Sequence, residues 1–262
     1  TPIKSSAASD VYKRQKFIGG SMTKNVICIK WGTKFGPEYV NRLYHMVEKN
    51  LSIPHRFVCF TDNSEGLSEG IETRELPPYE DNPNIGDKGW RKLSLFNEKL
   101  ADLEGTALFL DLDIVIRSDL TPFFEAEGEF LIVKDWDFPD DIIGNSSVFR
   151  FEVGKHPDVL ENFYKLGNEI RHDYKNEQAF LSYEMDRKGI LKYWSSDWCV
   201  SFKRNCLQPF PLNFFLMPKD PENAKIIVFH GRPTPEQAYK GFMGKGGLRY
   251  VKPTKWLDKY YQ

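Results

Sequence analysis

One short stretch, Ala107–Ile116, constrains the fold more than any other part of the chain. It is a run of apolar, partly β-branched residues without glycine or proline, which is typical of a buried strand in a parallel sheet. Two carboxylates, Asp111 and Asp113, interrupt this run one residue apart. In a strand they would point to the same face, where their charges repel and are costly to bury. The carboxyl ends of parallel strands open onto a cleft, so a cation or water there could accommodate the pair.

The Asp111–Asp113 pair has two interpretations. It can bind a hard divalent cation, Mg²⁺ or Mn²⁺, which bridges to the phosphates of a ligand. Alternatively, the strand runs into a solvated loop, and both aspartates are simply exposed or cap a helix. A lone Asp-x-Asp motif does not separate these interpretations, so the remainder of the chain must decide between them.

The composition excludes several classes of function. A length of 262 residues fits one large α/β domain or two small ones. The 36 basic and 37 acidic residues leave no electrostatic footprint for nucleic acid. No apolar run approaches the length needed to span a bilayer. The cysteines have no zinc-site spacing, which indicates reduced, buried thiols and a cytoplasmic location. They are Cys28, Cys59, Cys199 and Cys206.

The first residues do not have the pattern of a folded segment. Residues 1–22 lack core periodicity, and their sequence resembles a translated adaptor. We therefore expect residues 1–22 to be a non-native or disordered leader, with Met22 near the true start. The domain is expected to span residues 23–262.

The next elements predict a nucleotide-binding half-fold. A strand at Asn25–Lys30, a helix opened by Pro37 and a strand at Arg56–Asp62 form a strand–helix–strand unit. This unit places Lys30–Thr33 and Thr61–Asp62 at one rim of the sheet. An ordinary Asx turn is an equal alternative for Thr61 and Asp62.

Several later elements would carry polar residues to the same rim. A helix from Gly89 to about Leu103 begins with Lys88, Arg91 and Lys92, where free N–H groups favour anions, although a solvated basic face is also possible. Further strands are expected at Ile71–Leu76, Glu129–Asp135, Asn145–Phe151 and Lys225–His230. Helices are expected at Val159–Ile170 and after Asn176-Glu177-Gln178. Residues 194–208 are expected to be irregular.

Two residues of these elements have both a functional and a structural interpretation. His230 ends a strand beside Gly231 and Arg232, where the imidazole can bind a metal while the backbone and guanidinium bind phosphate. A lone histidine is more often structural. Glu177 can act chemically or simply interact with the dipole of the helix that it begins.

In their order along the chain, these motifs resemble those of GT-A fold glycosyltransferases, most closely the glycogenin-like and bacterial lipopolysaccharide and capsule group. The resemblance implies a single α/β GT-A domain, with a mixed, mostly parallel sheet flanked by helices. The matching motifs are Lys30-Trp31-Gly32, Phe60-Thr61-Asp62, Gly89-x-x-Lys92-Leu93, Phe109-Leu110-Asp111-Leu112-Asp113, Asn145-Ser146-Ser147, Asn176-Glu177-Gln178 and Phe229-His230-Gly231.

The resemblance also implies an activity. It implies metal-dependent transfer of a sugar from a nucleotide-diphosphate sugar, with uridine the expected base, to a glycan or lipid-linked acceptor. Retention of configuration and a place in surface-polysaccharide synthesis are expected. The chain's aromatic content and basic C-terminal tail also allow peripheral contact with a membrane.

Roles for individual residues follow from the same resemblance. Asp111, Asp113 and His230 would bind Mn²⁺ or Mg²⁺. Catalytic roles near the donor sugar would fall to Asn145, Glu177 and Gln178, and contacts with the donor nucleotide and its phosphates to Lys30, Trp31, Thr61, Asp62, Lys92, Gly231 and Arg232.

Two departures from the family pattern affect these roles. Glu177-Gln178 stands where the family has Asp-Gln, and Gly231-Arg232-Pro233-Thr234-Pro235 lacks the family's lysine. The phosphate role of that lysine is therefore expected to pass to Arg232. An inverting enzyme would also need a base for the acceptor hydroxyl. The candidates for such a base are Asp135, Asp137, Asp140 and Glu177.

Two other classes of protein remain as alternatives. A haloacid-dehalogenase-type phosphatase also places Asp-x-Asp after an apolar strand, and Asp111-Leu112-Asp113 fits that motif. However, that fold usually has the motif near the N-terminus and a Gly-Asp-rich motif downstream, which is missing here. A catalytically silent nucleotide-sugar-binding protein would bind nucleotide without turnover.

Overall fold

The computed structural model describes residues 23–86, 89–244 and 250–261. Its main sheet has the strand order β3-β2-β1-β4-β7-β6-β8. β1 is parallel to β2 and β4, whereas β7 is antiparallel to β4 and β6, which confirms the predicted mixed, mostly parallel sheet. The strands are β1 (Lys24–Lys30), β2 (Arg56–Thr61), β3 (Glu72–Arg74), β4 (Thr106–Leu110), β6 (Phe130–Lys134), β7 (Gly144–Glu152) and β8 (Leu191–Tyr193).

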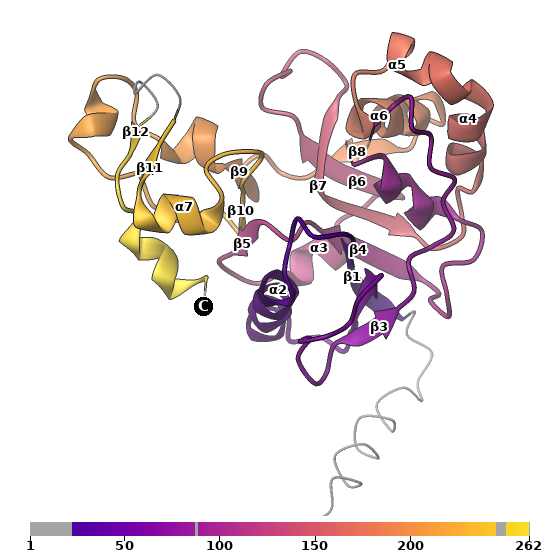
Figure 1. The fold of residues 1–262 in the computed structure, drawn as a ribbon, viewed down its shortest axis with the longest axis horizontal. Coiled ribbons are helices and arrows are strands. Elements are labelled where there is room, and N and C mark those ends of the chain that lie inside the picture. Colours follow the sequence, from indigo (N-terminus) through magenta and orange to yellow (C-terminus); the bar gives the residue numbers. More distant parts are fainter. Residues whose placement is uncertain (1–22, 87–88, 245–249, 262) are drawn as a thin grey trace, which may run out of the picture.

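Helices cover both faces of this sheet (Figure 1). The alternation of β1 directs Val26 and Cys28 toward α2 (Pro37–Asn50), and Ile27 and Ile29 toward the opposite layer. Proline at the first turn of α2 and apolar residues at helical spacing explain why this segment folds as an amphipathic helix. The opposite layer contains η1 (Trp90–Phe96), α4 (Asp158–Leu166), η2 (Gly167–Glu169), α5 (Ile170–Asp173) and α6 (Glu177–Arg187).

A smaller sheet connects the main sheet to a C-terminal lobe, which we define as the described residues 202–244 and 250–261. Its order is β5-β10-β9, with β10 antiparallel to β5 and parallel to β9. Figure 1 shows the lobe, in orange and yellow, beside the main sheet. The remaining elements are β5 (Ile114–Ile116), α3 (Thr121–Glu125), β9 (Cys199–Ser201), η3 (Phe202–Cys206), η4 (Leu212–Phe214), β10 (Ile226–Val228), α7 (Pro235–Lys240), β11 (Phe242–Met243), β12 (Tyr250–Val251) and η5 (Lys255–Lys259).

The prediction of one continuous strand over Ala107–Ile116 is wrong. β4 ends at Leu110, and β5 begins at Ile114 in the smaller sheet. The Asp111–Asp113 segment forms the turn between them, so the two aspartates are not same-face residues of one strand. The amide of Asp111 still donates to the carbonyl of Ser147, after which the chain leaves the main sheet.

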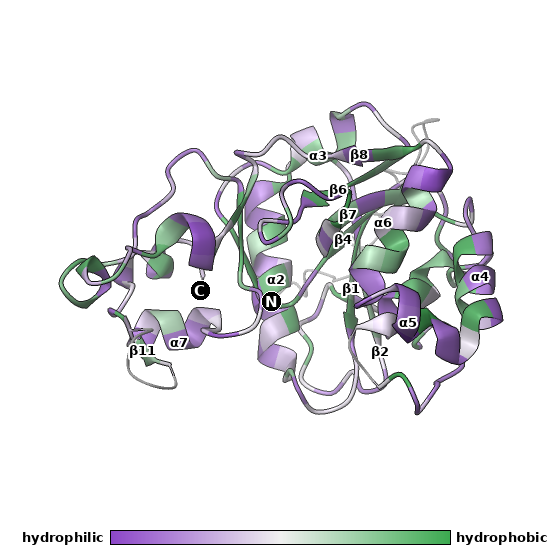
Figure 2. Ribbon diagram, turned by 90° about the horizontal axis from the view of Figure 1, so that it is seen from above, coloured by the Kyte–Doolittle hydropathy of each residue, from purple (hydrophilic) through white to green (hydrophobic). Residues whose placement is uncertain are grey.

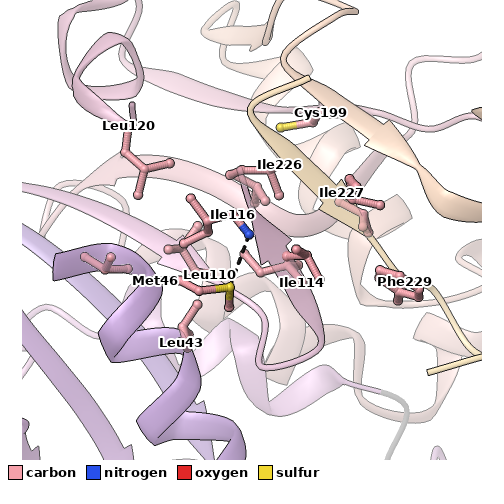
Figure 3. Close-up of a cluster of buried hydrophobic side chains, with 14 of the residues drawn as sticks. Leu43, Met46, Leu110, Ile114, Ile116, Leu120, Cys199, Ile226, Ile227 and Phe229 are labelled. Carbon is pink, nitrogen blue, oxygen red and sulfur yellow. Dashed lines mark hydrogen bonds between the residues drawn. The ribbon is translucent and has the colours of Figure 1, made fainter. Parts of the chain in front are cut away.

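The reason for this break is the packing of β5. All three of its residues are fully buried, because α2 covers one side and β10 pairs along its edge. Figure 3 shows Met46 of α2 against β5, where the amide of Ile116 donates to Met46 Sδ at 3.4 Å. Burial in a second sheet therefore produces the same apolar sequence pattern as one long buried strand.

Three other expectations need correction. The helix expected to run from Gly89 to Leu103 is limited to the 3-10 segment η1, and the Asn97 side chain bonds the carbonyl of Ser94 at its end. The helix expected at Val159–Ile170 ends at Gly167, which has a positive φ of 51°. The region 194–208, expected to be irregular, contains β9 and the π-helical turn η3.

Three further expectations concern the first residues, membrane-spanning helices and the cysteines. The proposed leader, residues 1–22, lies outside the described residues. Within the described ranges, no helix combines the length and the apolar character needed to cross a membrane. All four cysteines are buried free thiols.

Candidate functional site

A cavity of about 520 Å³ opens at one edge of the sheet, where β1 and β4 end and the antiparallel strand β7 begins. The start of η1, the start of α6 and the segment after β10 complete its walls. Most of the predicted site residues therefore meet in one place, although they come from six separate segments. Those that line the cavity are Trp31, Lys92, Asp111, Asp113, Asn145, Glu177, Gln178, His230 and Gly231.

A buried network of charges forms the floor of this cavity. Lys92 Nζ lies 2.8 Å from Asp111 Oδ1 and donates to Asp111 Oδ2 at 2.9 Å, and it donates to the carbonyl and hydroxyl of Ser146 at 3.2 Å. The Ser146 hydroxyl in turn donates to Glu177 Oε1 at 2.8 Å. Burial opposes the charged form of Lys92, but Asp111 and Glu177 outweigh it and raise the pKa of this lysine. Burial raises the pKa of the Glu177 carboxyl.

Asp113 lies next to this network in an electrostatically unfavourable position. Desolvation, followed by the charge of Asp111, raises the pKa of Asp113 to about 7, and Lys92 and Lys34 offset only part of the effect. A divalent cation at this point would neutralise both carboxylates, and carboxylate oxygens are the ligands that Mg²⁺ and Mn²⁺ prefer. The donor set at Asp111 and Asp113 therefore fits the predicted cation.

His230 is held from three sides. Its Nε2 lies 2.7 Å from Ser201 Oγ, its ring stacks on Trp136 with centroids 5.6 Å apart, and its carbonyl accepts from Lys203 Nζ. Burial, followed by the charge of Lys203, lowers the pKa of His230, so the imidazole is neutral near pH 7. A neutral ring is the form that a metal ligand requires.

The predicted metal triad is nevertheless not assembled. In the described part of the chain, no three His, Cys, Asp or Glu side chains lie close enough together to hold a metal ion. His230 lines the same cavity as Asp111 and Asp113, but its Nε2 faces Ser201. Asp111 and Asp113 are the part of the predicted triad that the geometry favours.

The carboxamides predicted to face the donor sugar are fixed by local hydrogen bonds. Gln178 Nε2 donates to Asp135 Oδ2 at 2.8 Å, and Asn145 Oδ1 accepts from the amide of Ser147 at 3.1 Å. The Asn176 side chain caps α6 by accepting from the amide of Ala179, which explains why α6 begins here and presents Gln178 at the cavity.

Four predicted residues do not line the cavity. Lys30 Nζ and Thr61 Oγ1 both donate to the carbonyl of Asn63, so these side chains stabilise the turn after β2. Asp62 Oδ2 accepts from the amide of Gly32 at 2.8 Å and thereby holds a loop that does line the cavity. Arg232 is exposed at the surface beside Gly231.

The sequence did not single out several residues that complete this site. Ser146 lies within the quoted Asn145-Ser146-Ser147 motif, so its position could have been inferred. Trp136 and Ser201 gave no sequence signal, because their contacts with His230 join segments distant in the chain.

Gly89 is required at the cavity wall for a reason that can be tested. It has φ of 87°, and a Cβ placed on it would lie 3.0 Å from the Glu177 carboxyl carbon. We expect Gly89→Ala to lower the free energy of unfolding, measured in urea, by about 1–3 kcal/mol. Gly86→Ala is the matched control, since Gly86 also has a positive φ (67°) but no atom within 4 Å of the added Cβ. Equal losses in both variants would show that backbone strain, and not contact with Glu177, requires glycine here.

Comparison with known proteins places the fold. No protein-family model matches the sequence, and no curated protein matches it. Among solved structures, the galactosyltransferase LgtC in complex with donor and acceptor sugar analogues matches with a TM-score of 0.56 at 15% identity, over 90% of this chain and 94% of that chain. An active-site mutant of LgtC matches with a TM-score of 0.56 at 16% identity, over 91% and 96%.

A third solved structure agrees. The glycosyltransferase GlyE of Streptococcus pneumoniae TIGR4 matches with a TM-score of 0.56 at 12% identity, over 81% of this chain and 56% of that chain. At these identities the likeness concerns architecture. The mixed sheet and its flanking helices are thus arranged as in these structures, and the chain has the GT-A glycosyltransferase fold.

Proposed function

We propose that this chain is a metal-dependent glycosyltransferase that uses a nucleotide-diphosphate sugar, with UDP as the nucleotide. The observation that carries the proposal is the position of Asp111, Asp113 and Lys92 together at the strand-end cavity of a GT-A fold. The resemblance of the motifs supports retention of configuration, a glycan or lipid-linked acceptor and a role in surface-polysaccharide synthesis. The buried free thiols support a cytoplasmic location.

The residues have distinct tasks in this proposal. Asp111 and Asp113 would hold Mn²⁺ or Mg²⁺, and His230 would become the third ligand by turning its Nε2 from Ser201 toward the cavity. The bound cation would neutralise charge on the departing diphosphate. Lys92 holds the Asp111 carboxylate in place and adds positive charge beside the leaving group. Gln178 and Asn145 present carboxamides that can orient the donor sugar.

The surroundings of the acidic residues support retention over inversion. An inverting reaction needs a carboxylate free to take the proton of the acceptor hydroxyl. Here Glu177 accepts from Ser146, Asp135 accepts from Gln178, and Asp137 is paired with Arg204. Asp140 lines a separate hollow.

Calorimetric titration with UDP, GDP, CDP and ADP tests the proposal. We expect UDP to bind at least about tenfold more tightly with Mn²⁺ than with EDTA, because the cation links the carboxylates to the diphosphate. Absence of nucleotide binding in Mn²⁺ would contradict the proposal. Assays with UDP-sugars then separate an enzyme from a silent binding protein, and turnover of p-nitrophenyl phosphate would favour the phosphatase alternative.

A further inference from the structure

The C-terminal lobe exposes a cluster of large apolar side chains, which we call the apolar loop patch. Within the described residues, six of the eight exposed large hydrophobic side chains belong to it, and Phe210 and Phe215 are 67% and 71% exposed. Figure 2 shows the green loop of this patch at the end of the molecule far from α4 and α5. The patch consists of Phe210, Leu212, Phe215, Leu216, Met217 and Met243.

The loop of this patch buries a polar side chain and exposes apolar ones. Asn213 is buried and donates to the carbonyl of Tyr250, while the nearby Leu212 and Phe215 are exposed. Phe214 stacks on Tyr250, which pairs with Met243, so the two parts of the patch adjoin. An exposed apolar cluster of this kind marks an interaction surface.

The backbone of the loop is internally bonded. The amides of Asn213, Phe215 and Leu216 donate to carbonyls within the loop. The carbonyls of Phe215 and Met217 accept from the side chains of Lys252 and Gln208. The loop can therefore enter an apolar phase without taking these polar groups away from their partners.

The uneven distribution of charge along the chain points to an anionic partner. Residues 202–262 contain eleven basic and four acidic residues, whereas residues 1–201 contain 25 basic and 33 acidic residues. A chain of net charge −1 is thus divided into a segment of +7 and a segment of −8. Exposed Lys219, Lys240 and Lys255 lie in the same lobe as the patch, and Lys252 contacts it directly.

Two of the four acidic residues of the lobe are paired with arginines outside it and so do not cancel the charge of its lysines. Asp220 is paired with Arg117 and Glu236 with Arg42, whereas Glu222 and Asp258 remain exposed. Exposed apolar side chains together with an excess of lysines are the combination by which proteins bind the interface of an anionic bilayer. We infer that the apolar loop patch and the exposed lysines of the same lobe dock the protein on an anionic lipid membrane.

Co-sedimentation with lipid vesicles tests this inference. We expect the full chain to bind phosphatidylcholine vesicles that contain phosphatidylglycerol at least about tenfold more tightly than vesicles of phosphatidylcholine alone. The double variant Phe210→Ser/Phe215→Ser should lose about tenfold or more in affinity, because it removes the two most exposed apolar anchors. Lys219→Glu/Lys255→Glu should remove the preference for the anionic lipid.

Controls separate docking from other effects. Phe138→Ser changes an exposed phenylalanine in the acidic loop after β6 and should leave vesicle binding unchanged. Equal binding to both vesicle types, or unchanged binding of the Phe210/Phe215 variant, would overturn the inference. Dimers in the ultracentrifuge that the same variant dissociates would assign the patch to a second copy of the chain instead. The inference does not rest on the proposed transferase function, and UDP titration of the variant tests that function separately.

Discussion

Lys92→Met is expected to lower the free energy of unfolding by about 3 kcal/mol in metal-free buffer. The methionine keeps the aliphatic length but removes the ammonium that lies 2.8 Å from Asp111 and also bonds Ser146. Removal of one partner of a buried ion pair leaves the other charge uncompensated, which typically costs about 3–5 kcal/mol. We expect the lower end of this range because the Asp111 side chain remains 23% exposed. Urea denaturation in EDTA measures the effect.

The same variant should respond differently to a cation. When Mn²⁺ is added, Lys92→Met should regain more stability than the wild type, because the cation replaces the lost positive charge beside Asp111. UDP binding in Mn²⁺ should still weaken at least tenfold, since the ammonium beside the leaving diphosphate is gone. Lys92→Arg retains the charge and should lose less in both measurements.

Arg91→Met provides the matched control for Lys92→Met. Arg91 is the preceding residue of η1, and its partner Asp81 is 74% exposed. A pair of this kind contributes about 0–1 kcal/mol. If both methionine variants lost the same stability, the buried contacts of Lys92 would contribute no more to the free energy of unfolding than a surface ion pair does.

The local elements of the fold could be predicted from the sequence because each has its own pattern. β1, α2 and β2 combine apolar periodicity with clear starts and ends, and the structure places them within one or two residues of expectation. The arrangement of Asp111 and Asp113 near a strand end was also correctly expected.

Features that depend on distant segments could not be predicted in this way. No local sequence pattern distinguishes one long buried strand from β4 followed by β5. The two differ because β5 pairs with β10, which lies more than a hundred residues later in the chain. Likewise, β9 has three residues and is defined by its pairing with β10. The sequence therefore indicated which residues are buried but not which sheet contains them.

The site shows the same division between chemistry and geometry. Residue types at strand ends indicated carboxylates, a lysine and a histidine at one rim. The contact of Lys92 with Ser146, and of Ser146 with Glu177, joins three elements whose relative positions no periodicity specifies. His230 was expected as a ligand, but its contact with Ser201 depends on the pairing of β9 with β10.

Asp113→Asn is expected to stabilise the metal-free protein above neutral pH and at the same time to abolish Mn²⁺-dependent UDP binding. The folded chain raises the pKa of Asp113 to about 7, so between about pH 4 and pH 7 the folded state holds a proton that the unfolded state releases. The contribution of this carboxyl to stability therefore falls as pH rises through that window and stays low above it. Asparagine avoids the loss, which amounts to about 2–4 kcal/mol at pH 8.

Asp111→Asn should change stability in the opposite direction, which makes the two variants a matched pair. Asp111 is the partner of the Lys92 ammonium, so its loss leaves a buried cation without its main counter-charge. We expect Asp111→Asn to unfold at lower urea concentration than the wild type, and Asp113→Asn at higher concentration, in EDTA at pH 8. Both should lose Mn²⁺-dependent UDP binding if both carboxylates hold the cation. Retention of that binding in Asp113→Asn would remove Asp113 from the metal site, because a residue that binds the cation cannot be dispensable for it.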